Sequence, residues 1–200
     1  PITKFLMKFN IYELKERSLV EKMSKDIDII EAGAGIGLIS MYLKKKTKDK
    51  KLVMIEPNKK INEIIKNNFI SNGFSEDQII IENYGLSDEI RNNVLFTKFE
   101  SDMANTISNE SLNYNFKKKN IDYIETTNLN SIITKYKINK FQLVLDIEGE
   151  EANVLTKNNE WLKNCQSILL ENHLPKEKLI KLNNYILNKN FQIVSKKENV

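Results

Sequence analysis

The sequence predicts an α/β fold in which a mostly parallel central sheet carries helices on both faces. Three observations support this prediction. Short runs rich in Ile, Leu and Val alternate with longer segments whose apolar residues recur at helical spacing. The short runs are apolar throughout, which is typical of strands buried on both faces. The first run ends in a cluster of small residues, at the end of a strand where sheets of this kind bind ligands.

The first half of the chain alternates regularly between helix and strand. The run at 26–31 is rich in Ile and ends at glycines, as a buried strand does. Asn58 is placed to cap a helix that Asn72 and Gly73 end, and its apolar face comprises Ile61, Ile64, Ile65 and Phe69. In order, we expect a leading helix over 11–23, a strand over 26–31, a helix over 36–46, a strand over 51–56, the helix capped by Asn58 and a strand over 78–82.

The second half resumes this alternation after an interruption. Residues 101–120 are polar with few helix or turn signals, which indicates a functional or disordered loop, and Asp102, Tyr114 and Phe116 are candidates there for lining an acceptor pocket. Trp161 is expected to serve packing. In order, we expect strands over 94–99 and 121–125, a helix over 128–136, a strand over 141–146, a helix over 150–155, a strand over 167–171, a helix over 175–188 and a last strand over 191–195.

Length and composition point to one cytoplasmic globular unit. We expect 1–25 to form a helical lead-in and 26–200 to form a single domain of ordinary size. The sole cysteine, Cys165, has no internal disulfide partner, which suits a reducing compartment, and one Cys with one His excludes a zinc site of Cys and His ligands. The sequence shows no signal peptide and no apolar run long enough for a membrane span.

The charge pattern argues against nucleic acid as a partner. The net charge is +4, but Arg occurs only at Arg17 and Arg91, whereas nucleic-acid contacts usually include several Arg residues. The lysine runs at 44–46 and 117–119 have the simpler explanation of solvated helix ends and loops.

A glycine-rich turn between the first strand and its helix is the strongest local signal. Glycines at 33, 35 and 37 let the backbone turn tightly and approach a ligand, while the helix that follows presents free N–H groups. A dinucleotide-binding turn would place its third glycine at 38, where this chain has Leu38. The spacing, with Glu31 two residues before the first glycine, resembles the nucleotide loop of class I S-adenosylmethionine-dependent methyltransferases.

An acidic residue ends the second strand. Glu56 lies where a carboxylate can accept hydrogen bonds from both ribose hydroxyls of a nucleoside. Its alternative explanation is an exposed residue at a strand end. The acidic character also suits a cationic sulfonium cofactor better than a phosphate-rich one.

Further motifs carry a resemblance to the FkbM-type methyltransferases. The stretch D-I-E-G-E-E at 146–151 resembles the family's D-V-E-G-x-E signature, and other pieces follow in the family's order: E-P-N at 56–58, G-L-S-D at 85–88, T-N-L-N-S at 127–131, L-L-E at 169–171 and N-F at 190–191. The chain departs from the family pattern at Val144, where Lys is common, at Glu31 in place of Asp, and at Asn130 in place of an acid.

The resemblance implies a Rossmann-like class I methyltransferase fold, S-adenosylmethionine as cofactor, and methyl transfer, generally to oxygen, of a small molecule or carbohydrate. By that resemblance Glu31 and the turn with Gly33, Gly35 and Gly37 hold the methionine end. Glu56 binds the ribose, Asn83 and Tyr84 flank the adenine, and the methyl group faces the strands that end at Asp146 and Glu171.

Three side chains are candidates for the base that takes the acceptor's proton: Asp146, Glu148 and His173. Asp146 is also expected to orient acceptor or cofactor, and His173 is equally compatible with an exposed loop position. Glu148 and Glu151 have a second explanation, as acids at a helix start. A divalent ion between Asp146, Glu171 and Asn172 is compatible with the sequence, which does not require one.

Two other functions remain open. One is methylation of RNA, which the lysine runs favour; steeply salt-dependent binding would mark it. The other is a cofactor-binding scaffold without catalytic activity. The sequence gives no information on the acceptor or on the oligomeric state.

Overall fold

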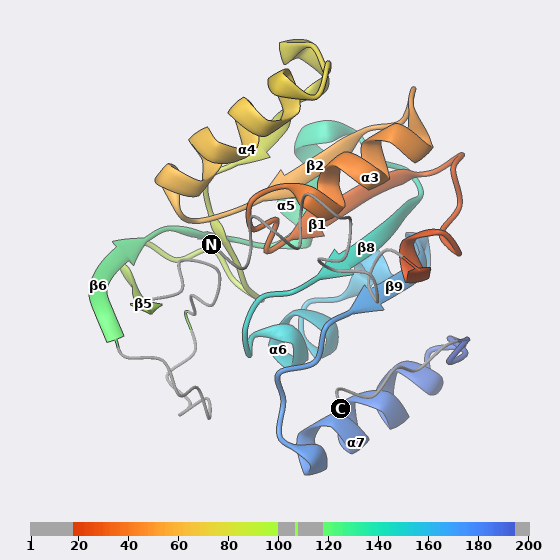
Figure 1. Cartoon of the computed structure of the whole chain (residues 1–200). Coiled ribbons are helices and arrows are strands. Elements are labelled where there is room, and N and C mark those ends of the chain that lie inside the picture. Colours follow the sequence, from red (N-terminus) through yellow and green to blue (C-terminus); the bar gives the residue numbers. More distant parts are fainter. Residues whose placement is uncertain (1–17, 100–106, 108–117, 195–200) are drawn as a thin grey trace.

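A central five-stranded sheet organises the computed structural model, which describes residues 18–99, 107 and 118–194 (Figure 1). All neighbouring strands in it are parallel, in the order β3-β2-β1-β8-β9. The predicted α/β fold with a parallel sheet and helices on both faces is confirmed. The strands are β1 (Asp28–Ala32), β2 (Leu52–Ile55), β3 (Ile80–Glu82), β8 (Phe141–Leu145) and β9 (Cys165–Leu170).

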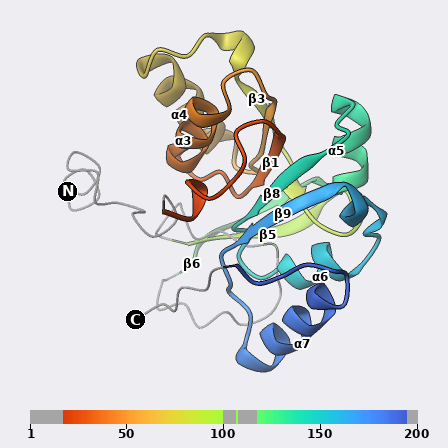
Figure 2. The same ribbon diagram turned by 90° about the vertical axis from the view of Figure 1, so that its right-hand side faces the viewer.

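Alternate residues of the central strands face two separate apolar cores. Ile29, Leu52 and Met54 pack toward α3 and α4, whereas Ile30 and Val53 belong to the core beneath α5, α6 and α7. Both faces of the sheet are therefore covered, as Figure 2 shows in the view along its edge. The helices are α3 (Leu38–Thr47), α4 (Lys59–Ser71), α5 (Leu129–Tyr136), α6 (Glu151–Thr156) and α7 (Lys176–Leu187), with short 3₁₀ turns η1 (Glu76–Gln78) and η2 (Glu160–Asn164).

Two small strand pairs lie outside the main sheet. Residues between β3 and α5 form β4 (Gly85–Leu86), which pairs with β7 (Thr126–Thr127), and the antiparallel pair β5 (Val94–Phe99) and β6 (Lys118–Ile124). The sequence predicted the second pair but not the first, because two-residue strands leave no periodic signal. The predicted positions of Asp102, Tyr114 and Phe116 fall outside the described residues.

Most predicted elements are present, and helix caps explain several boundaries. The Asn58 side chain accepts a hydrogen bond from the Lys60 amide and begins α4, as the sequence predicted, while Asn128 begins α5 in the same way. Trp161 is buried beside Phe141, with ring centroids 6.0 Å apart, and serves packing as expected. In the part of the chain that is described, no helix is both long and apolar enough to cross a bilayer.

Two structural predictions are wrong. Ile64 does not join the buried face of α4: it is 41% exposed, because the buried stripe runs through Ile61, Ile65 and Phe69 at four-residue spacing. Residues 191–194 form no strand, since no described residue pairs with the outer edge of β9, and Ile193 and Val194 are exposed.

The lead-in segment is fastened to the sheet by a side-chain amide. Most of the helix predicted over 11–23 lies outside the described residues, but 18–20 are helical and Val20 and Met23 pack in the core beside α3. Buried Gln142 on β8 accepts from the Ser24 amide at 2.7 Å and donates to the Ser24 carbonyl at 2.8 Å. This pairing joins residues 118 positions apart.

We predict that Gln142→Leu lowers the free energy of unfolding by about 2 kcal/mol or more, because it leaves two polar groups of Ser24 without their amide partner. Urea denaturation followed by circular dichroism measures the change. Ser167→Ala is the control, since it removes a single hydrogen bond of 3.1 Å to the same amide and should cost about 1 kcal/mol or less. Equal losses in the two variants would contradict the role given to Gln142.

Candidate active site

A large cleft opens at the carboxyl ends of the central strands. The chain leaves β1 toward β2 and leaves β8 toward β9, so connections diverge between these two adjacent strands, where parallel sheets bind ligands. The cleft has a volume of about 1290 Å³ and continues along β9 to α7. Its lining includes Glu31, Gly33, Gly35, Glu56, Asp146, Glu148 and Glu171.

The turn after β1 is packed against the end of β8. Gly33 has a φ of 80°, and a side chain there would overlap the carbonyl oxygen of Asp146. The Asp146 amide in turn donates to the Ala32 carbonyl at 3.0 Å. Gly37, with a φ of 81°, begins α3 against Ile65 of α4. At Gly33 both the backbone conformation and the lack of space exclude a side chain, whereas at Gly37 the positive φ favours glycine and a Cβ would lie 3.1 Å from the Ile65 side chain.

Gly35 differs from Gly33 and Gly37, the other two glycines of the turn. Its φ of 51° also favours glycine, but a Cβ there would meet no atom within 4 Å. Because Gly35 lines the cleft, that open space belongs to the region where a ligand would lie. The backbone at this position is therefore exposed to the cleft for contact with a ligand and is not needed for packing.

Two acidic side chains at neighbouring strand ends are buried in the cleft wall. Glu31 on β1 is 2% exposed, and Glu56 after β2 is 7% exposed. The Glu56 carboxylate accepts a hydrogen bond of 2.9 Å from the Asn58 amide. Burial raises the pKa of Glu56 to about 7, although hydrogen bonds from the Asn58 and Gly35 amides oppose this rise. The alternative of an exposed strand-end residue is excluded for Glu56.

Asn83 and Tyr84, predicted to flank an adenine, are not among the residues that line the cleft. The Asn83 amide donates to the carbonyls of Glu56 and Pro57, at 3.0 and 2.8 Å, and so ties the end of β3 to the end of β2. Tyr84 packs against the core beneath α5. The adenine assignment stays a prediction.

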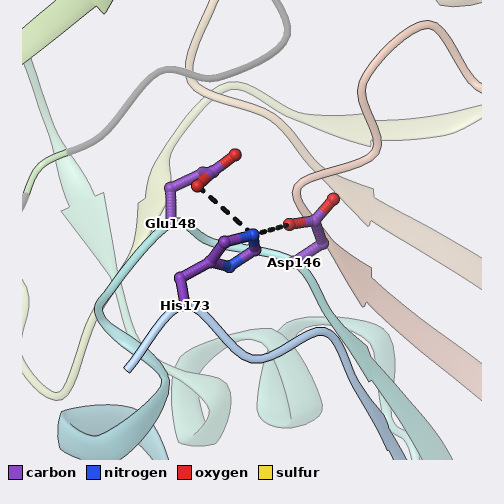
Figure 3. Close-up of side chains that lie close together, drawn as sticks. All are labelled: Asp146, Glu148 and His173. Carbon is purple, nitrogen blue, oxygen red and sulfur yellow. Dashed lines mark ion pairs between the residues drawn. The ribbon is translucent and has the colours of Figure 1, made fainter. Parts of the chain in front are cut away.

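The three candidate catalytic side chains lie close together (Figure 3): Asp146 and Glu148 line the cleft, whereas His173 contacts both of them but is not among the lining residues. His173 Nε2 is 3.4 Å from Glu148 Oε2 and 3.7 Å from Asp146 Oδ1. Asp146 follows β8 and His173 follows β9, so parallel pairing of these strands brings residues 27 positions apart in the sequence into contact. The side chain of His173 is only 16% exposed, which excludes the exposed-loop alternative.

Two further carboxylates complete the surroundings of His173. Its Nδ1 lies 3.1 Å from Oε1 of Glu151, whose side chain is fully buried, and its Nε2 lies 3.9 Å from Glu171 Oε1. Glu151 also accepts from the Gly149 amide at the start of α6. Glu151 therefore lies in the first turn of α6, as predicted for an acid at a helix start. Its contact with His173 was not predicted from the sequence.

The ionisable groups of this cluster shift one another's pKa. Burial alone would lower the pKa of His173, but the Glu151 hydrogen bond and the charges of Glu148 and Asp146 raise it to about 9. Burial raises the pKa of Glu148 to about 7, against the attraction of His173. The arrangement holds a positive charge on the ring at neutral pH. Glu148 has a φ of 55°, an uncommon conformation for a residue with a side chain.

Comparison with known proteins assigns the family. The model of the methyltransferase FkbM domain matches residues 31–193, which include both the glycine turn and the histidine cluster. The chain belongs to the FkbM methyltransferase family. A crystal structure of methyltransferase FkbM from Methylobacillus flagellatus KT has a similar fold, with a TM-score of 0.55 and 19% sequence identity. The alignment covers 83% of this chain and 38% of that one, and no curated protein matches significantly.

The family motifs of this FkbM member divide between the cleft and its support. Asp146 and Glu148 of the 146–151 signature line the cleft, whereas Glu150 lies 3.2 Å from the Ser87 hydroxyl, in the G-L-S-D motif. Arg91 donates to the same hydroxyl, and Lys157 pairs with Asp88 at 3.3 Å. The G-L-S-D motif thus contacts both ends of α6, with Ser87 at Glu150 before its start and Asp88 at Lys157 after its end.

We predict losses of different size for alanine at two glycines of the turn. Gly33→Ala should destabilise the fold by about 3 kcal/mol or more, because the methyl group overlaps the Asp146 backbone. Gly35→Ala should cost about 1 kcal/mol, for its left-handed conformation, since its methyl group enters open space. Thermal unfolding compares the two variants. A Gly35→Ala protein as unstable as Gly33→Ala would disprove this assignment of the open space.

Proposed function

We propose that the chain is an S-adenosylmethionine-dependent methyltransferase that acts on a hydroxyl group of a small molecule or carbohydrate. The observation that carries the proposal is that three features surround one cleft: the glycine turn, the buried Glu56, and the cluster of Asp146, Glu148 and His173. Family membership supports methyl transfer, and the residues of the cleft support the cofactor and the acceptor atom.

The cleft fits the cofactor in shape and charge. Its volume of about 1290 Å³ exceeds what a ligand of this size needs, and the open space at Gly35 allows a close approach to the backbone. Glu31 and the turn would hold the methionine end, and Glu56 would accept hydrogen bonds from the ribose hydroxyls. When bound, the cofactor supplies a methyl group activated by a sulfonium charge, which the surrounding carboxylates favour.

The histidine cluster is suited to an acceptor that carries a hydroxyl group. A hydroxyl is a weak nucleophile until it loses its proton, and Asp146, Glu148 and His173 are the ionisable groups gathered at that side of the cleft. Holding the acceptor oxygen in line with the transferred group contributes roughly 7–11 kcal/mol to lowering the barrier. These residues would orient the acceptor hydroxyl, and the negative charge of the carboxylates would favour the loss of its proton.

RNA is a weaker candidate for the acceptor. The cleft is lined by Glu31, Glu56, Asp146, Glu148 and Glu171, a concentration of carboxylates that repels a phosphate backbone. The chain's net charge of +4 therefore does not describe the charge at its site.

We predict that cofactor affinity rises about tenfold between pH 6 and pH 8, because Glu56 has a pKa of about 7 and must be ionised to bind the ribose strongly. Isothermal titration calorimetry with S-adenosylhomocysteine measures this profile. Glu56→Gln should bind S-adenosylhomocysteine about 10–100-fold more weakly at pH 8. Its affinity should also lose the part of the pH dependence that comes from Glu56.

Thermal unfolding of Glu56→Gln is the control. The raised pKa means that the folded state favours the protonated carboxyl, so the contribution of Glu56 to stability falls as pH rises from about 4.5 to 7. A neutral amide escapes this loss, and the variant should be at least as stable as the parent at pH 8. No binding of the cofactor at millimolar concentration, by a folded parent protein, would exclude the proposed function.

Transfer to oxygen is tested with a methyl-labelled cofactor and pools of hydroxylated small molecules and carbohydrates. We predict label in products that survive mild alkali, as methyl ethers do and methyl esters do not. Label in RNA, with binding that weakens steeply with salt, would favour the nucleic-acid alternative. Cofactor binding without transfer to any of these acceptors would favour a scaffold.

A further inference from the structure

Three potential ligand atoms converge on one point in the cleft. Asp146 Oδ1, Glu148 Oε2 and His173 Nε2 all lie within 4.8 Å of one another, and the two carboxylates approach the same ring nitrogen (Figure 3). The side chains of Asp146 and Glu148 line the cleft, and the two oxygens that converge on His173, Asp146 Oδ1 and Glu148 Oε2, are buried in its wall. The set combines two carboxylates with an imidazole and is not a purely acidic cluster.

We propose that Asp146, Glu148 and His173 bind a divalent transition-metal ion of the Mn²⁺ type. An ion about 2.1 Å from each donor places neighbouring donors about 3 Å apart in an octahedral arrangement. The observed separations from Nε2, 3.4 and 3.7 Å, exceed this by less than 1 Å. The two carboxylate oxygens lie within 4.8 Å of one another, so side-chain rotations that draw the three donors together would close the site around an ion.

Glu151 supplies the outer contact that a metal-binding histidine requires. Such a histidine donates its second ring N–H to a carboxylate or carbonyl, which sets the tautomer and the direction of the ring. Here Nδ1 faces fully buried Glu151 at 3.1 Å, so Nε2 is the nitrogen presented to Asp146 and Glu148. Glu151 is itself held by the Gly149 amide, which keeps its carboxylate fixed in place.

The electrostatics of the site favour an added positive charge. Asp146, Glu148, Glu151 and Glu171 all lie within 4 Å of His173. A divalent ion placed between Asp146, Glu148 and His173 would therefore be attracted by four nearby carboxylates, two of them in the ligand set and two outside it.

The types of donor atom indicate which metal ion the site would bind and which residues would bind it. Imidazole with carboxylates suits Mn²⁺ and its neighbours better than Mg²⁺, which prefers oxygen donors and retained waters. The set that the sequence suggested, Asp146 with Glu171 and Asn172, is less suitable. The Asn172 side-chain oxygen already accepts a hydrogen bond of 3.1 Å from the Leu174 amide.

Such an ion would bind the acceptor hydroxyl during the reaction. It would lower the pKa of that hydroxyl, so that the proton leaves to solvent water and the oxygen keeps the electron pair that forms the new bond to the methyl group, while the S–CH₃ bond breaks and its electron pair goes to the sulfonium sulfur, which leaves as a neutral thioether. This catalytic use rests on the proposed function, whereas binding of the ion does not.

Electron paramagnetic resonance of Mn²⁺ titrated into the whole chain, without cofactor, tests the site. We expect one bound ion, and electron spin-echo modulation from a ¹⁴N nucleus that is absent in His173→Gln. Glu148→Gln and His173→Gln should weaken binding at least tenfold. Glu151→Gln, which changes no ligand atom, should weaken it about 10–100-fold through the orientation of His173.

Glu171→Gln is the matched comparison, because it removes the same charge 3.9 Å from His173 Nε2 but no ligand atom, and it should weaken binding several-fold less than Glu148→Gln does. No bound Mn²⁺, no ¹⁴N modulation, or a loss confined to Glu171→Gln would overturn the proposal. Circular dichroism and binding of S-adenosylhomocysteine show that each variant is folded. Cofactor binding without Mn²⁺ binding rejects the metal site alone, and the reverse result rejects the proposed function alone.

Discussion

The close packing of Gly33 against the backbone of Asp146 is the constraint on which the site depends. It brings the turn after β1 and the end of β8 into direct contact, and the Asp146 amide completes that contact by donating to Ala32. The glycine turn and the first acid of the 146–151 signature therefore face one cleft from adjacent strands. A side chain at Gly33 would separate two halves of the site that lie more than a hundred residues apart in the sequence.

The negative charge of the cleft is opposite in sign to the net charge of the whole chain. The protein carries a net charge of +4, yet the cleft gathers carboxylates from four strand ends. Burying Glu56 and Glu148 raises their pKa to about 7, so the folded chain carries a stability cost at neutral pH for keeping them charged. A bound cation offsets part of that cost, whether it is a sulfonium or a metal ion. Such a cost is common where binding, not folding, sets the choice of residues.

One short motif builds both the reactive part of the site and its foundation. Asp146 and Glu148 face the cleft, Glu150 reaches the Ser87 hydroxyl beneath it, and Glu151 holds His173 from behind. The acidic side chains around the start of α6 therefore point to three different places: the cleft, Ser87 and His173. The left-handed conformation of Glu148 and the flexibility of Gly149 allow this divergence over so few residues.

Local sequence patterns were enough to predict the alternation of strands and helices, the glycine turn, the cap at Asn58 and the acids at the strand ends, because each depends on residues close together in the chain. It did not determine the exposure of Ile64, the unpaired segment at 191–194, the hold of Gln142 on Ser24, or the place of Asn83 outside the cleft lining. It named Asp146, Glu148 and His173 as candidates and Glu171 as a possible metal ligand, but it did not predict that four carboxylates lie within 4 Å of the histidine. These features depend on which strands become neighbours in the folded chain, and no local pattern records such contacts.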